Sequence, residues 1–190
     1  VGVFTTGTAG RTIVGDADMT IGEGSFGYVL KNTGTTKLTT NSSPVTLKNN
    51  AKYIYSDNGD VTIINNVPLT STGNNAYGIY SAGKIENNAD INFGTGTGSV
   101  GIYAINGGTA TNNSGAAITV SGSNTKTTPA EYGMGMATSN GTIINNGIIK
   151  VGLENGIGMF ASGSGSKAIN NGIIELSGKS TKGMYIDNNA

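Results

Sequence analysis

Few residues of this chain have the type and spacing that catalysis requires. Cysteine and histidine are absent, which removes thiolate nucleophiles, the usual zinc ligands and the commonest general base. Clustered aspartates could still act on a polysaccharide if several neighbouring strands brought them to one groove. Asp16 and Asp18 form such a pair, but the corresponding positions further along the chain hold Pro44 and Pro68. We therefore predict that the protein is not an enzyme and that it holds no metal or cofactor.

Two further motifs suggest chemistry but are better explained as turns. The glycine-rich segment at residues 94–98 is similar to a phosphate-binding loop, but no helical pattern follows it to present an N-terminus. Ser123 and Lys126 have the Ser-x-x-Lys spacing of some acyl-transferring enzymes, whose companion motifs are missing here. We expect a flexible corner at the first motif and a polar loop at the second.

The elements that would position these residues repeat about every 25 residues along the chain. The segment GTIINNGIIKVG at residues 141–152 returns as KAINNGIIELSG at residues 167–178. A glycine followed by an aliphatic and usually an aromatic residue precedes each copy, as at Gly78 and Gly101. A unit of this length cannot bury its own apolar face, so it must stack on its neighbours.

Apolar and polar residues alternate within each repeat, which indicates β-strands. Ile149 and Val151, for example, flank Lys150, and the 32 glycines of the chain supply corner conformations. The sequence predicts an all-β fold, a right-handed parallel β-helix of about seven rungs, each of about 25 residues with three short strands. The repeats begin and end in mid-unit, so we expect residues 1–190 to be a single β-helical segment of a longer array.

An asparagine recurs at the first corner of almost every rung. Because equivalent side chains of successive rungs lie on one another in a parallel helix, these amides can form hydrogen bonds along the axis. Gly15 takes the asparagine position in the first rung, and the ladder is predicted to contain Asn41, Asn65, Asn87, Asn112, Asn145 and Asn170. Two positions before the ladder we expect an inward residue, which is Thr39 in the second rung and alanine or an aliphatic residue in the others. Four and six positions after it, mostly aliphatic residues should form two core columns.

Composition limits the partners of the protein. The formal net charge is zero, with 11 basic and 11 acidic residues, so bulk charge does not attract nucleic acid. No apolar segment reaches the roughly 18 residues of a transmembrane helix. A chain without cysteine also suits secretion across an oxidising periplasm.

The Gly-aliphatic-aromatic phrase and the Gly-x-Ile-x-Asn-Asn-Gly-x-Ile-x-Val phrase, at this spacing, resemble the passenger repeats of bacterial type V autotransporters. They are most similar to those of the very large outer-membrane adhesins of fusobacteria, over nearly the whole chain. The resemblance implies a monomeric adhesin or adhesin stalk on the bacterial cell surface. Its partner would be a protein or glycan of a host cell or another bacterium, and its membrane attachment would be a carboxy-terminal barrel that this sequence does not contain. The alternative is a polysaccharide-processing or phage tailspike-type β-helix, which would show a carboxylate-lined groove.

Two features could contact a ligand. A column of mostly aromatic residues includes Tyr80 and Tyr103, and strand alternation turns it outward if the preceding aliphatic column faces the core. The opposite orientation, with the aromatic column buried, remains open. The second feature is an insertion at residues 121–132, which contains Lys126, Glu131 and Tyr132. Insertions in a solenoid leave the stack as loops and often carry recognition, although this one could also be without function.

Overall fold

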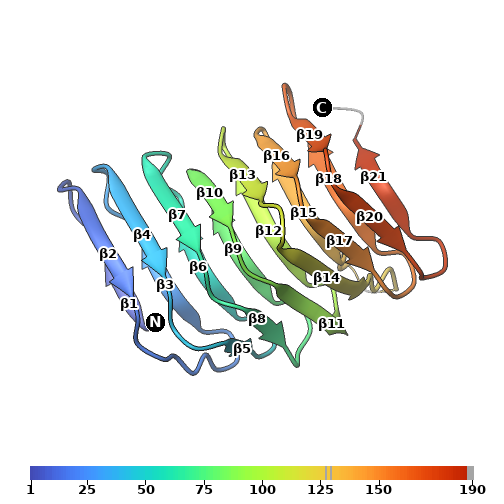
Figure 1. Ribbon diagram of the computed structural model, residues 1–190, viewed down its shortest axis with the longest axis horizontal. Coiled ribbons are helices and arrows are strands. Elements are labelled where there is room, and N and C mark those ends of the chain that lie inside the picture. The colour runs from blue at the N-terminus through green and yellow to red at the C-terminus, as the bar shows by residue number, and fades with distance from the viewer. Residues whose placement is uncertain (127, 129, 188–190) are drawn as a thin grey trace.

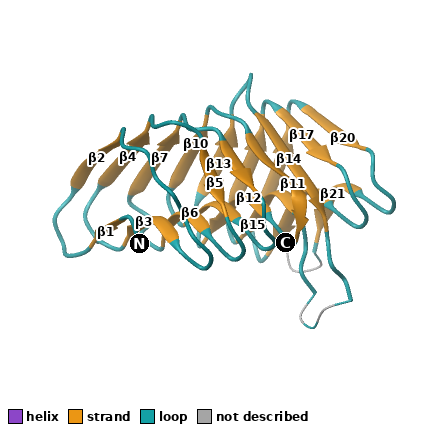
Figure 2. Cartoon of the chain, turned by 90° about the horizontal axis from the view of Figure 1, so that it is seen from below, coloured by secondary structure: helices purple, strands orange, loops and turns teal. Residues whose placement is uncertain are grey.

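The chain is a parallel β-solenoid in the computed structural model, which describes residues 1–126, 128 and 130–187 (Figure 1). Within these residues the structure contains strands and loops but no helix, as Figure 2 shows by colour. The part of the chain that is described also contains no helix that could cross a membrane. In Figure 1 the rungs follow one another in chain order along the long axis.

Three parallel sheets form the sides of the coil. Sheet A contains β1 (Val3–Thr5), β3 (Phe26–Leu30), β6 (Lys52–Ser56), β9 (Tyr77–Ser81), β12 (Val100–Ile105), β15 (Met134–Ser139), β18 (Ile157–Ser162) and β21 (Lys182–Ile186). Sheet B contains β2 (Arg11–Gly15), β4 (Thr36–Thr40), β7 (Val61–Asn65), β10 (Lys84–Asn87), β13 (Thr109–Asn112), β16 (Thr142–Asn145) and β19 (Lys167–Asn170). Sheet C contains β5 (Val45–Leu47), β8 (Leu69–Ser71), β11 (Ile91–Thr97), β14 (Ala117–Gly122), β17 (Ile148–Val151) and β20 (Ile173–Leu176). Each strand pairs with its equivalent one rung earlier and later, so the predicted parallel β-helix is confirmed.

The core consists of columns of like residues. In sheet A, Ile54, Ile79 and Ile102 are register partners and have no exposed surface. In sheet C, Ile91 pairs with Ile118 in the first of the two columns expected after the ladder. A glycine lies beside the core position in most sheet A strands because a Cβ at Gly78 would come within 2.4 Å of the Gly101 carbonyl oxygen. The glycine of the repeated phrase therefore allows neighbouring rungs to approach.

The asparagine ladder runs through the buried corner between sheets B and C. Asn65 Nδ2 donates to Asn87 Oδ1 at 2.8 Å, Asn87 to Asn112 at 2.9 Å, and the series continues through Asn145 to Asn170. The same amides also donate to carbonyls of the chain, as Asn87 does to Ala89. Both donor hydrogens of a buried amide are thereby used.

The ladder position in the second rung is a correction to the sequence prediction. Thr40, not Asn41, pairs with Asn65, and its hydroxyl donates to Asn65 Oδ1 at 2.9 Å. Leu38 accordingly faces the core in place of Thr39. The corner between Thr40 and β5 is one residue longer than its neighbours, and this extra residue shifted the predicted register by one position.

Asn41 belongs to a second, exposed ladder that runs beside the buried one. Its Nδ2 donates to Asp16 Oδ1 at 3.1 Å, and its Oδ1 accepts from Asn66 Nδ2 at 2.8 Å. Asn88 and Asn113 extend the ladder with hydrogen bonds of 2.8 and 2.7 Å. The repeated Asn-Asn pair therefore supplies one amide to each of two parallel ladders.

Candidate functional site

The outer face of sheet A brings together the aromatic column and the inserted loop. Tyr55, Tyr80 and Tyr103 are register partners and are partly exposed, whereas the preceding residues are buried. The aromatic column therefore faces outward, which the sequence left open. Further along the same column are Ala137, Phe160 and Tyr185.

The tyrosines of this row pack mainly on one another. Tyr55 and Tyr80 are stacked, with ring centroids 5.5 Å apart and an angle of 8° between the planes. Tyr103 and Tyr77 meet Tyr80 edge to face at 5.2 and 6.1 Å. Burial raises the pKa of Tyr80 and Tyr103, and nearby tyrosines raise both further. Both of these phenols therefore stay neutral at pH 7. Tyr55 covers one face of the Tyr80 ring.

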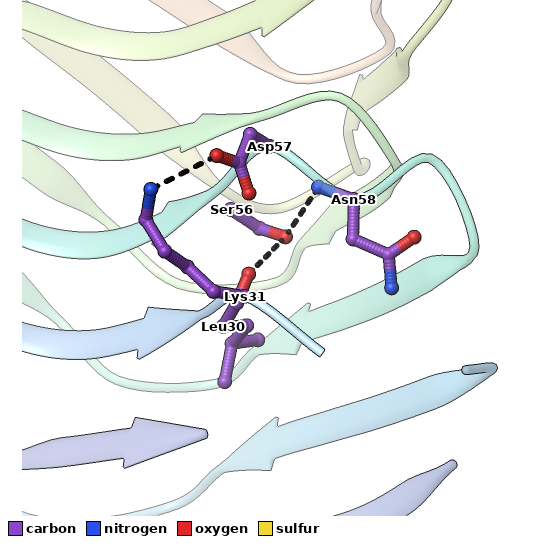
Figure 3. Close-up of polar contacts among 5 residues, drawn as sticks. All are labelled: Leu30, Lys31, Ser56, Asp57 and Asn58. Carbon is purple, nitrogen blue, oxygen red and sulfur yellow. Dashed lines mark hydrogen bonds and ion pairs between the residues drawn. The ribbon is translucent and has the colours of Figure 1, made fainter. Parts of the chain in front are cut away.

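Lys31 lies beside Tyr55, at the amino-terminal end of this row. Lys31 Nζ is 5.5 Å from the Tyr55 ring centroid and forms an ion pair of 3.1 Å with Asp57. The hydrogen bond to Asp57 raises the pKa of Lys31. Ser56 Oγ in the same corner donates to the Leu30 carbonyl at 2.9 Å and accepts from the Asn58 amide at 3.2 Å (Figure 3). The bond to Leu30 joins two successive rungs. Lys31 thus lies beside the Tyr55 ring and pairs with Asp57.

The insertion leaves the coil at Ser123 and returns at Gly133. Ser121 and Gly122, which the sequence placed in the loop, still belong to β14; residues 127 and 129 of the predicted insertion lie outside the described residues. Ser123 Oγ donates to the Asn155 carbonyl at 2.8 Å and accepts from the Gly133 amide at 3.0 Å. These bonds fasten the neck of the loop and occupy the hydroxyl that the Ser-x-x-Lys motif would need as a nucleophile.

Within the loop, the three residues selected from the sequence have different surroundings. Lys126 is exposed, and its backbone amide donates to Asn124 Oδ1 at 3.3 Å. Glu131 Oε1 accepts from Asn75 Nδ2 at 2.7 Å, so it anchors the loop to an earlier corner. Tyr132 is 47% exposed. The structure thus brings Glu131 to the sheet A side and leaves Lys126 and Tyr132 open to solvent.

A groove of about 460 Å³ lies on the other side of the loop, over the last rungs of sheet A. Tyr132 and Thr125 of the loop line one part of it, and Ile157, Phe160 and Tyr185 line another. Phe160 and Tyr185 are stacked, with centroids 5.8 Å apart. Sequence reasoning included both rings in the aromatic column but did not select them. The sequence did contain a signal for the groove: at the first position of the sheet A strands, Tyr77 is followed by smaller aliphatic residues in the next rungs.

Asp18, which suggested polysaccharide chemistry, and Asp90, at the same position of a later rung, both lie at corners. Asp18 Oδ1 accepts from the Ser43 amide at 3.1 Å, and Asp90 Oδ1 accepts from the Ala117 amide at 2.8 Å. Each aspartate therefore stabilises a turn of the next rung. In the described part of the chain, no three of Asp, Glu, His and Cys are grouped closely enough to hold a metal ion.

The structure is thus a parallel β-solenoid in which the aromatic column, the inserted loop and the groove all lie on the outer face of sheet A. Residues 5–190 match the family model of the BigA third pectate lyase-like domain, and the chain belongs to that family. Searches of curated proteins and of solved structures found no match.

Proposed function

We propose that this chain is a surface-exposed passenger segment of a bacterial autotransporter-type protein and acts as a non-enzymatic adhesin. Its partner is a protein or glycan on a host cell or another bacterium, and its location is the bacterial cell surface. It works as a monomer without a cofactor. The repeated phrases resemble those of the fusobacterial adhesins named above, and the family assignment fits a passenger region of this kind.

The observation that carries this proposal is the docked loop on sheet A. Its neck is fastened by Ser123, and Glu131 ties it to Asn75 on the same side as the tyrosine row. A loop that a rigid scaffold holds in place is a common site of recognition. A stalk that only spaces other domains does not require such a loop, because stacking of the regular rungs already makes a rod.

The alternative is a polysaccharide-processing enzyme, which the pectate lyase-like family description favours. Against it, Asp18 and Asp90 accept hydrogen bonds from backbone amides at corners. A glycosidase needs two carboxylates at a separation that suits the sugar. Incubation of the chain with pectin and other polysaccharides should release no reducing ends; release that is lost on substitution of an aspartate would favour the enzyme.

Adhesion can be tested with beads that carry the purified chain. We expect the beads to bind epithelial cells or bacteria, and the double variant Tyr80→Ala, Tyr103→Ala or removal of the loop to weaken binding. Thr46→Ala with Thr70→Ala is a matched control, because these two hydroxyls meet at 2.9 Å on the exposed face of sheet C. Beads that bind neither cell type would support a spacer, and equal losses in the sheet A and sheet C variants would contradict the assignment of the face.

A further inference from the structure

The outer face of sheet A has two outward columns, formed by the first and fourth positions of its strands, and its amino-terminal half is filled. Phe26, Lys52 and Tyr77 are register partners in the first column. Lys52 Nζ lies 5.4 Å from the Phe26 centroid and 4.8 Å from that of Tyr77. Phe26 also meets Tyr55 of the fourth column edge to face at 6.0 Å. Large side chains of the two columns therefore pack together and close the space between them.

The carboxy-terminal half of the same face is open. Met134 and Ile157 follow Tyr77 and Val100 in the first column, and Ile157 is only 5% exposed. Phe160 and Tyr185 stand in the fourth column, and Tyr132 of the loop faces the same space. Met134 and Ile157 are smaller than Tyr77, and Lys182, the next residue of this column, lies at the edge of the space that they leave, so the groove of about 460 Å³ remains between the columns. Its volume lies in the range of small-molecule sites.

We propose that this groove binds a short, neutral oligosaccharide. The inference rests on the adhesin function proposed above and names the chemistry of its ligand. Aromatic rings and aliphatic side chains form most of the lining, and Tyr132 and Tyr185 combine an apolar body with a polar tip. Such surfaces suit the apolar faces of a sugar ring.

Polar groups at the edge of the groove supply the complementary hydrogen bonds. Asn155 has an amide, Lys182 an ammonium group and Asp187 a carboxylate, and all three line the groove. These groups can donate to and accept from sugar hydroxyls. One positive and one negative charge leave the groove without net charge, so its charge complements a neutral sugar rather than a sulfated or sialylated one.

The shape of the groove favours an oligosaccharide over a single sugar or a protein. Its floor is formed by residues of three successive strands, β15, β18 and β21, which are spaced about 4.8 Å apart. A protein partner of ordinary affinity needs about 800 Å² of contact on each side. The tyrosine row is a poorer sugar platform, because Tyr55 and Tyr80 cover each other.

A glycan array tests the proposal directly. The labelled chain is applied to printed neutral oligosaccharides of glucose, galactose, mannose and N-acetylglucosamine, together with sialylated and sulfated ones. We expect binding to neutral oligosaccharides. Phe160→Ala removes an aromatic wall, and Ile157→Tyr fills the groove with the residue that Tyr77 already places in this column. Each should weaken binding about tenfold or more.

Tyr55→Ala, in the filled half of the face, is the matched control and should bind as the parent does. Unchanged thermal midpoints would show that all three variants are folded, and since Tyr is native to the column, Ile157→Tyr keeps the test valid if Phe160→Ala unfolds. Binding only to acidic glycans or only to proteins, or neutral-glycan binding that neither groove variant weakens, would overturn the inference. If the beads adhere to cells but the chain binds no neutral oligosaccharide, the oligosaccharide inference fails and the adhesin proposal stands. If the chain binds neutral oligosaccharides on the array but the beads do not adhere to cells, only the adhesin proposal fails.

Discussion

Asn75 donates a 2.7 Å hydrogen bond from Nδ2 to Oε1 of Glu131, which lies 56 residues later in the chain. Asn75 has a φ of 55°, at the corner that leads into sheet A. The residue one rung later is Gly98, and a Cβ there would lie 2.8 Å from Cβ of Glu131. The amide, the glycine and the carboxylate thus dock the inserted loop against the coil.

Glu131→Ala should release the loop without unfolding the coil. Hydrogen bonds to charged groups contribute about 1.5–3 kcal/mol, and here the contribution is local to the loop. We expect limited proteolysis to cut the loop several times faster, with a nearly unchanged thermal midpoint. Glu154→Ala is the control, because its exposed ion pair with Lys179 is 3.8 Å long and contributes little. Equal cleavage rates for the two variants would argue against docking by Glu131.

The two asparagine ladders predict different costs for adjacent residues. Asn87 has no exposed surface, and its amide bonds to Ala89 and Asn112. Asn87→Ala leaves buried partners unpaired, so we expect it to lower the free energy of unfolding by about 1–3 kcal/mol. Asn88→Ala removes only exposed hydrogen bonds and should cost less than about 0.5 kcal/mol. Urea denaturation measures both, and a larger loss for Asn88→Ala would reverse the assignment of the ladders.

The buried ladder does not extend to Gly15, because the Tyr28 side chain occupies the space that an asparagine side chain would need there. A Cβ at Gly15 would lie 2.1 Å from Oη of Tyr28, which is almost fully buried. Gly15→Ala should therefore destabilise the first rungs by about 1–3 kcal/mol. Gly22→Ala is a fair comparison, since its Cβ would have no neighbour closer than 3.9 Å. Combination with Tyr28→Phe should recover part of the loss; an additive loss would show that the two positions do not interact.

Much of the fold could be predicted from the sequence because stacking makes each rung repeat its neighbour. The core columns and the ladder from Asn65 to Asn170 follow from that period. The shift at Thr40 could not be predicted, because the extra residue lengthens this rung by one (Tyr28 pairs with Ile54) but the length of the rung does not show at which corner it lies. The groove was also missed, because it depends on the different sizes of Tyr77 and Ile157 at one column position. The alternation of apolar and polar residues does not distinguish side chains by size.

Tyr53 should make the coil sensitive to alkali. Burial raises its pKa to about 12, whereas an unfolded tyrosine titrates near 10. Between about pH 10 and 12 the unfolded state loses a proton that the folded state retains, so stability falls as pH rises, by roughly 2–3 kcal/mol in total. Tyr53→Phe should reduce this slope but not abolish it, because burial also raises the pKa of Tyr28 and Tyr77. Urea midpoints measured across this range would show an unchanged slope if Tyr53 were not responsible.

Removal of residues 124–132 should leave a regular rung. The Gly98 amide donates to the Gly122 carbonyl and the Ser123 amide to the Glu154 carbonyl, so Ser123 follows Gly98 in the same corner column. Met134 pairs with Val100, and direct joining of Ser123 to Gly133 reproduces the spacing of the preceding rung. No artificial bridge is required. Loop shortening changes closure entropy by about 1 kcal/mol or less, so we expect a β-rich circular dichroism spectrum and a thermal midpoint within a few degrees of the parent.

The same deletion tests whether the loop contacts a partner or is an insertion without function. It removes Tyr132 from the groove and Lys126 and Glu131 from the face, while the tyrosine row and the rest of the coil remain. If the loop contacts the partner, beads with the deleted chain should bind cells much more weakly than parent beads, even though the thermal midpoint is preserved. Parent-like adhesion of both this variant and Tyr80→Ala, Tyr103→Ala would place the contact away from the loop and the tyrosine row. Loss of adhesion together with a large fall in the midpoint would instead mean that the loop is part of the scaffold.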